Sequence, residues 1–111
     1  MKNLFQEIPP AGADEFFETL AKTGQVRIER IVSRGHDSPA EGWFDADKTE
    51  WVALLRGGAR LQFEDGRELR LGPGDWLEIP ARCRHRVAWT DPHRATVWLA
   101  LHYEPAPDTT P

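Results

Sequence analysis

The chain has 111 residues, the length of one small domain, and its 14 basic and 18 acidic residues give a net charge of −4. This balance excludes a general attraction to nucleic acids or anionic membranes, and no stretch approaches the roughly 20 apolar residues of a membrane helix. The first residues lack the apolar run of a signal peptide and the single cysteine, Cys83, has no disulfide partner, so we expect a cytoplasmic protein.

The segment 1–24 is predicted to form an arm followed by a short helix. Two adjacent prolines near its start bar regular structure. The aspartate at position 14 is a suitable N-cap for a helix over 14–22, and a glycine two residues further on would end it. Phe16, Phe17 and Leu20 would share one face of this helix, so we expect that face to pack on the rest of the domain.

From residue 25 onward the apolar residues alternate with a period of two, which indicates β-strands. The predicted strands cover residues 25–33, 42–45, 50–56, 59–64, 68–71, 76–79, 84–90 and 95–103. Short strands separated by glycine, proline and aspartate turns, without strand–helix alternation, are typical of a β-sandwich or β-barrel. The segment 104–111 contains three prolines and little that could pack, so we predict a disordered tail.

Two motifs within residues 38–103 resemble those of the small single-domain cupins of the RmlC-like type. The more complete motif is glycine, five residues, proline, any residue, glycine, two residues, histidine. Gly74, Pro80 and His85 fit its spacing. Arg82 departs from the pattern, because it stands where the family has the second glycine.

The other cupin motif is only half present. It consists of His-x-His, three or four residues, glutamate, six residues and glycine, and Glu50 and Gly57 fit its second half. The two histidine positions hold Trp43 and Asp45 at one permitted gap, and Phe44 and Ala46 at the other. Half of the usual metal ligands of the family are therefore missing or replaced.

The resemblance implies an all-β fold, a double-stranded β-helix (cupin or jelly-roll barrel) over residues 25–103. It also implies that the protein is often a homodimer, which agrees with apolar residues on both faces of the segments 51–56 and 95–103. It does not imply one reaction, because the family includes dioxygenases, isomerases, lyases and plain binding proteins.

His85 and Glu50 are the first candidates for chemistry. His85 shares a strand face with Val87 and Trp89, so its imidazole would point into the barrel, as a metal ligand or as a hydrogen-bonded core histidine. Glu50 shares a face with Val52, and a carboxylate buried there would need a metal, an arginine or a raised pKa. If the strand begins one residue later, Glu50 is a loop carboxylate instead.

Asp45 and His36 could complete a metal site with Glu50 and His85. Asp45 could replace a missing histidine, and His36 could reach the barrel mouth from its loop. The competing interpretations are a turn-forming aspartate and an exposed loop histidine. The metal would be a divalent transition ion such as Zn, Fe, Ni or Mn. His102 is not included, because we expect its strand to turn the opposite face to the lumen.

Trp43 and Trp89, together with Glu50, are the candidate residues for binding a small-molecule ligand. Two functions of different class follow. One is a metal-dependent enzyme of the dioxygenase, isomerase or lyase type, and the other is a metal-free module that binds or senses a small ligand without catalysis. The missing histidine pair favours the second, whereas Glu50 and His85 keep the first open.

Overall fold

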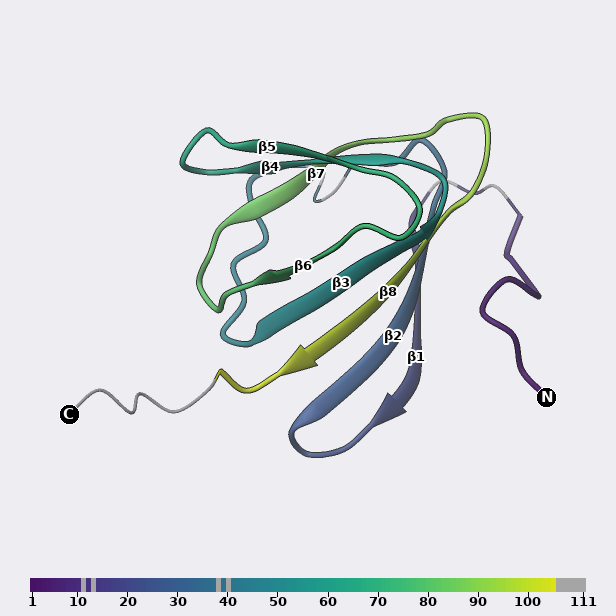
Figure 1. The fold of residues 1–111 in the computed structure, drawn as a ribbon, viewed down its shortest axis with the longest axis horizontal. Helices are drawn as coiled ribbons and strands as arrows, with labels where there is room; N and C mark the ends of the chain where they lie inside the picture. The colour runs from purple at the N-terminus through teal and green to yellow at the C-terminus, as the bar shows by residue number, and fades with distance from the viewer. Residues whose placement is uncertain (11, 13, 38, 40, 106–111) are drawn as a thin grey trace.

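The computed structural model describes residues 1–10, 12, 14–37, 39 and 41–105, and within them it contains eight β-strands and no helix, hence no helix that could cross a membrane (Figure 1). The strands are β1 (Phe16–Lys22), β2 (Val26–Ser33), β3 (Thr49–Arg56), β4 (Ala59–Phe63), β5 (Glu68–Leu71), β6 (Trp76–Ile79), β7 (His85–Thr90) and β8 (Thr96–Tyr103). They form a five-stranded sheet of order β1-β2-β8-β3-β6 and a three-stranded sheet of order β5-β4-β7.

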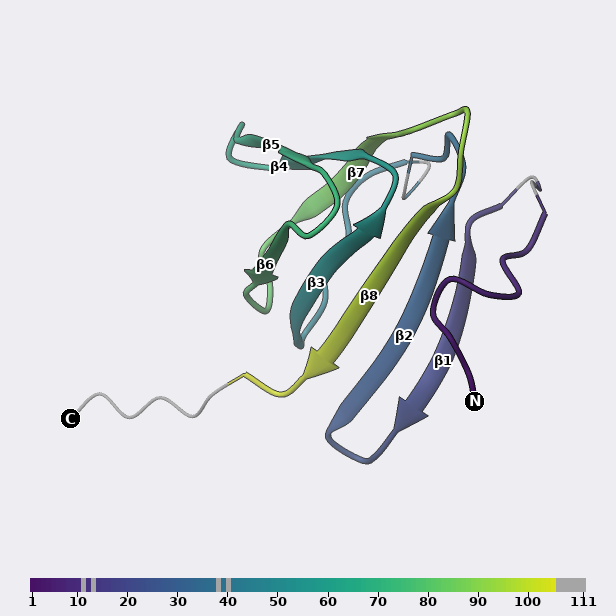
Figure 2. The ribbon, with the colours of Figure 1, turned by 45° about the vertical axis from the view of Figure 1, so that its right-hand side comes forward.

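The all-β prediction is confirmed, and β2 to β8 lie where the alternating pattern predicts strands. All neighbouring strands are antiparallel. The smaller sheet lies opposite β3 and β6, whereas β2 and β1 form the far side of the larger sheet (Figures 1 and 2). Within the predicted strand 42–45, Phe44 forms a single bridge to His85. The predicted tail reaches into 106–111, which lies outside the described residues.

The helix predicted for residues 14–22 is wrong, because this segment forms strand β1. β1 pairs with β2 in a hairpin that sets Phe16 opposite Val32 and Lys22 opposite Arg27. The apolar residues have a spacing that suits a helix, but adjacent aromatic residues also suit a strand. A helix this short is marginal in water, whereas the edge of β2 supplies hydrogen-bond partners for the whole segment.

The apolar core lies between the two facing sheets. It consists of Val52, Leu54, Ala59, Leu61, Phe63, Leu71, Ile79, Trp98 and Ala100. The turn between β3 and β4 fixes how the sheets meet. At this turn Gly57 has a φ of +92°, and a Cβ atom there would lie 2.7 Å from the Cα atom of Thr96, so only glycine fits.

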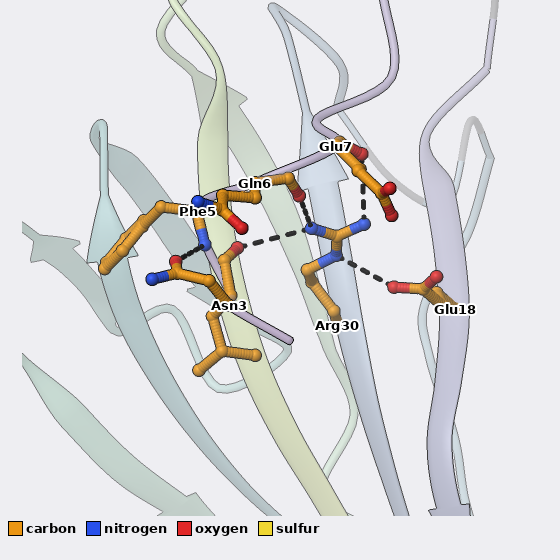
Figure 3. Close-up of polar contacts among 7 residues, drawn as sticks. Asn3, Phe5, Gln6, Glu7, Glu18 and Arg30 are labelled. Atoms are coloured by element: carbon orange, nitrogen blue, oxygen red, sulfur yellow. Dashed lines mark hydrogen bonds and ion pairs between the residues drawn. The ribbon is translucent and has the colours of Figure 1, made fainter. Parts of the chain in front are cut away.

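The N-terminal arm is tied to the outer face of the larger sheet by Arg30 of β2 (Figure 3). Its guanidinium donates hydrogen bonds to the backbone carbonyls of Leu4 at 3.3 Å, Gln6 at 2.8 Å and Glu7 at 3.3 Å. Its Nε atom lies 2.9 Å from a carboxylate oxygen of Glu18 on β1. Arg30 is only 5% exposed, so the arm and β1 together enclose a buried charge.

Candidate functional site

A cavity of about 370 Å³ opens between the two sheets. Much of its wall is apolar, and polar side chains gather on β2, β8, β3 and β7. The lining residues are Glu15, Phe17, Arg27, Glu29, Ile31, Phe44, Asp45, Ala46, Glu50, Val52, Leu61, Ile79, His85, Val87, Trp98 and His102. Its size and mixed lining are those of a site for a small molecule.

Three polar residues form a row across neighbouring strands of the larger sheet. Glu50 of β3 lies directly opposite His102 of β8. Glu29 of β2 lies two residue pairs further along, opposite Ala100 of β8, whereas Arg27 is the residue opposite His102. Since side chains two positions apart share a face of a sheet, the order β2-β8-β3 brings all three into the cavity side by side.

The imidazole of His102 bridges the two carboxylates. Its Nε2 atom lies 2.8 Å from Glu29 Oε1, and its Nδ1 atom lies 3.6 Å from Glu50 Oε2. The side chains of Glu29 and His102 are 10% and 13% exposed, and that of Glu50 is 23% exposed. Burial raises the pKa of Glu50, and the carboxylate of Glu29 adds to this, although His102, His85 and Arg27 act in the opposite direction.

His85 faces the same cavity from β7 of the smaller sheet. Its Nδ1 atom lies 2.9 Å from the backbone carbonyl of Cys83. A carbonyl only accepts, so Nδ1 donates this hydrogen bond and Nε2 is left for another contact. The rings of Phe44 and Phe63 lie 5.6 and 6.3 Å from the imidazole, centre to centre, and hold it in place.

A third carboxylate enters the cavity from Glu15, the residue before β1. Glu15 accepts a hydrogen bond from the hydroxyl of Ser33, which in turn accepts one from the indole of Trp98 at 3.2 Å. The other carboxylate oxygen of Glu15, Oε1, is buried and has no hydrogen-bond partner among the described residues. A buried acceptor without a partner is costly, so Glu15 lowers the stability of this wall of the cavity.

The structure brings Glu50 and His85 to one cavity but does not add Asp45 and His36 to them as further donors. Asp45 lines the cavity, yet its carboxylate pairs with Arg84 at 3.2 Å on the exposed side. His36 does not line it. Its Nδ1 atom accepts from the backbone of Arg34 at 2.9 Å, and Nε2 lies 3.1 Å from the carbonyl of Gly12.

The two candidate ligand-binding tryptophans, Trp43 and Trp89, are not among the residues that line this cavity. A bulge accounts for the position of Trp89. Val87 pairs with Leu61, but Trp89 pairs with the next residue, Arg60, so one residue of β7 is left unpaired. The bulge reverses the alternation, and Trp89 points outward with 46% of its surface exposed.

Sequence reasoning missed His102, Glu29 and Trp98. The expectation that the strand of His102 turns its opposite face to the lumen is wrong, because Trp98 and His102 line the cavity. Both faces of β8 are apolar enough to be buried, so alternation alone did not decide between them. The available signal was the adjacent charged pair Glu29 and Arg30 in the middle of a predicted strand.

The polar residues do not form a ready metal centre. Across residues 1–105, apart from the four positions left undescribed, no three histidine, cysteine, aspartate or glutamate side chains are arranged to hold a metal ion. His102 shows the reason, since both of its ring nitrogens already face carboxylates. We therefore derive no chemical step through a metal.

Comparison with known proteins assigns a family to this architecture. The model of the cupin domain family matches residues 31–102. No curated protein matches the chain. A crystal structure of a protein from Ralstonia eutropha JMP134, described as a candidate mannose-6-phosphate isomerase, is 43% identical, covers 95% of this chain and 98% of that chain, and has a TM-score of 0.89.

Two more distant crystal structures share the fold. An RmlC-like cupin with a double-stranded β-helix from Methanocaldococcus jannaschii is 18% identical, with a TM-score of 0.68 over 88% of this chain and 87% of that chain. A cupin superfamily protein from Desulfitobacterium hafniense DCB-2 is 18% identical, with a TM-score of 0.72 over 88% of this chain and 84% of that chain. The predicted double-stranded β-helix is thereby confirmed.

Proposed function

The chain belongs to the cupin domain family, and we propose that its cavity binds a small hydroxylated molecule. The observation that supports this is the row of Glu29, His102 and Glu50 set into a largely apolar cavity of about 370 Å³. Carboxylate oxygens accept hydrogen bonds from hydroxyls and an imidazole can accept or donate them, while apolar lining residues such as Ile31 and Val87 suit the apolar face of a ligand.

The charge of the cavity favours a neutral ligand over an anionic one. Among the described lining residues, Glu15, Glu29 and Glu50 supply three carboxylates, Asp45 is paired with Arg84, and Arg27 is the arginine of the wall. Arg27 is already 3.8 Å from Glu29. A sugar or another polyol fits this charge better than a sugar phosphate does, so the ligand of this chain need not be the one that the name of its Ralstonia relative suggests.

A proton transfer is the reaction that these residues could support. Burial raises the pKa of Glu50, which makes its carboxylate a stronger base than usual. His85 faces the same cavity with an Nε2 atom that can accept a proton. An isomerase moves a proton between neighbouring carbon atoms of a sugar, so Glu50 would be the base in such a step.

Calorimetric titration of the full chain tests the proposal. Mannose, mannitol and mannose 6-phosphate are added in turn, with a chelator present, and isomerase activity is assayed with each sugar. We expect saturable binding of a neutral polyol that Glu50→Gln weakens and the control Glu64→Gln, an exposed carboxylate paired with Arg84, does not. If no polyol binds, or if both variants behave alike, the proposal is wrong.

The alternative is that Glu50 and His85 bind a divalent transition metal such as Zn, Fe, Ni or Mn. The burial of Glu50 favours this, because a cation would offset the cost of a buried carboxylate. His102 would be the third candidate donor, once it released one carboxylate. Elemental analysis of protein purified without added metal tests it. Stoichiometric metal that is lost in His85→Ala supports the alternative, and metal-free protein with an unchanged Tm in added Zn, Ni or Fe contradicts it.

We also propose that the chain forms a homodimer through the outer face of β3 and β6. The indole rings of Trp51 and Trp76 lie 5.5 Å apart on that face, and Trp76 is 62% exposed. Exposed apolar pairs of this kind are common at interfaces. Sedimentation of Trp76→Glu beside the unmodified chain tests this, and a monomeric unmodified chain at micromolar concentration contradicts it.

The location in the cytoplasm and the lack of nucleic-acid binding stay predictions.

A further inference from the structure

A group of arginines and one tryptophan lies on the outer face of the smaller sheet, away from the cavity. Arg60 of β4 is directly opposite Arg70 of β5 on one side and Trp89 of β7 on the other. With Gly58, these side chains border a separate pocket of about 330 Å³. Ala59 and Leu71 complete its wall. We call this the outer arginine pocket.

The two arginines lack acidic partners. No ion pair joins Arg60 or Arg70 to any acidic residue within the described part of the chain. The Nε atom of Arg60 is buried and has no hydrogen-bond partner there. The nearest acidic residue by register is Glu68, which lies opposite Gln62 and not opposite either arginine. Within the described residues, the positive charge of this pocket is therefore not balanced by an ion pair.

Like charges directly opposite each other on neighbouring strands destabilise a sheet. An oxyanion between the two guanidinium groups would reverse this cost, because arginine donates paired hydrogen bonds to carboxylate or phosphate oxygens. The arrangement thus fits an anion better than it fits water alone.

Trp89 indicates what the anion is attached to. The bulge in β7 turns its ring out of the core and over Gly58, where a Cβ atom would lie 3.7 Å from the ring. The ring is 46% exposed beside the arginines. A large indole left in water is unfavourable, but it offers a surface on which a planar group can stack. Bulges often re-aim a side chain next to a binding site.

We propose that the outer arginine pocket is a second binding site, for a small aromatic molecule that carries a phosphate or carboxylate group. Arg60 and Arg70 bind the anionic group, and Trp89 stacks on the aromatic ring. This site is distinct from the cavity between the sheets, whose lining carboxylates favour a neutral ligand. Its occupant therefore differs in charge from the ligand proposed for the cavity.

Nuclear magnetic resonance titration of the full chain tests the proposal, with the indole N–H signal of Trp89 as the reporter, assigned by its loss in Trp89→Leu. The probes are phenyl phosphate, benzoate, inorganic phosphate and phenol at low salt. We expect saturable shifts with phenyl phosphate or benzoate, and the comparison of these two identifies the anionic group. Inorganic phosphate, which cannot stack, and phenol, which lacks the anion, should each bind at least about tenfold more weakly.

Matched variants locate the site. Arg60→Gln and Arg70→Gln should each weaken binding of the aromatic anion by about tenfold or more. Arg67→Gln is the control, because Arg67 is an exposed arginine of the same sheet region that pairs with Asp65. If Arg60→Gln fails to fold, Arg70→Gln on the exposed strand β5 still tests whether the arginines bind the anion. The proposal is overturned if phenol binds as well as phenyl phosphate, if the control loses as much affinity, or if no probe gives a saturable shift.

Discussion

Two charged residues that are adjacent in β2 serve opposite sides of the same sheet. Glu29 and Arg30 are both almost buried, at 8% and 5% exposure, yet they point in opposite directions. Arg30 lies under the N-terminal arm, where three backbone carbonyls and Glu18 surround its guanidinium (Figure 3). Glu29 lies in the cavity beside His102.

Arg30 and Glu29 differ in the groups that surround their charges. The partners of Arg30 are chain atoms that the fold itself fixes, so this charge ties elements together. On the other side of the sheet, Glu29 and His102 line the cavity, and the side chain of Glu50 beside them is 23% exposed. A buried charge whose partners belong to its own chain is structural, whereas one that faces a cavity can still bind a ligand.

Arg30→Met should give the largest effect on stability. It removes every hydrogen bond that Arg30 makes to the arm, and we expect a loss of about 3 kcal/mol in the free energy of unfolding, since hydrogen bonds to a charged group are strong. Urea denaturation measures the loss, and hydrogen exchange should show the amides near residues 4–7 opening first. Arg27→Met, on the same strand, is the control. The side chain of Arg27 is 44% exposed and lies 3.8 Å from a carboxylate oxygen of Glu29, so we expect a loss of less than about 1 kcal/mol.

The second prediction concerns the cavity side of the same strand. Glu29→Gln keeps the shape of the side chain but removes the charge that holds His102 Nε2. We expect a loss of about 1 kcal/mol in stability and a roughly tenfold weaker binding of the polyol, because the imidazole is no longer fixed in one orientation. Denaturation measures the loss of stability, and calorimetry on the same sample measures the loss of ligand affinity. A fall in stability equal to that of Arg30→Met, with unchanged ligand affinity, would show that both networks are structural.

Sequence patterns predicted the parts of this fold that depend on local alternation. The strands from β2 to β8 follow from the period of two, and the motif spacing indicated Glu50 and His85, which share the cavity. β1 could not be predicted in the same way, because its aromatic residues suit a helix and a strand alike and pairing with β2 decides between them. The outward direction of Trp89 depends on a bulge in β7, which the alternation does not reveal. The inward direction of His102 depends on which of two apolar faces of β8 is turned to the cavity.

A third prediction tests whether loss of an arginine is harmful in itself. Arg82 is exposed and has a φ of +67°, in the left-handed region that favours the glycine which the cupin motif has at this position. Arg82→Gly should therefore stabilise the protein by up to about 1 kcal/mol, because a side chain at positive φ is strained. An increase in Tm confirms it. A loss similar to that of Arg30→Met would mean that positive charge, rather than the buried network, sustains stability.

The smallest effect is expected from Glu50→Gln and lies in its pH dependence. Burial raises the pKa of Glu50 above the ordinary value of 4.5, so the folded state binds its proton more tightly than the unfolded state does. The contribution of Glu50 to stability is then full below pH 4.5 and is lost as the pH rises through the pKa of the folded state. Glutamine does not titrate, so its stability relative to the unmodified chain should be within about 0.5 kcal/mol at low pH and should improve as the pH rises. Denaturation midpoints from pH 4 to pH 8 measure this, with Glu64→Gln as the exposed control. An opposite slope would mean that His102 and Arg27 outweigh burial, and that Glu50, like Arg30, is saturated by its own chain.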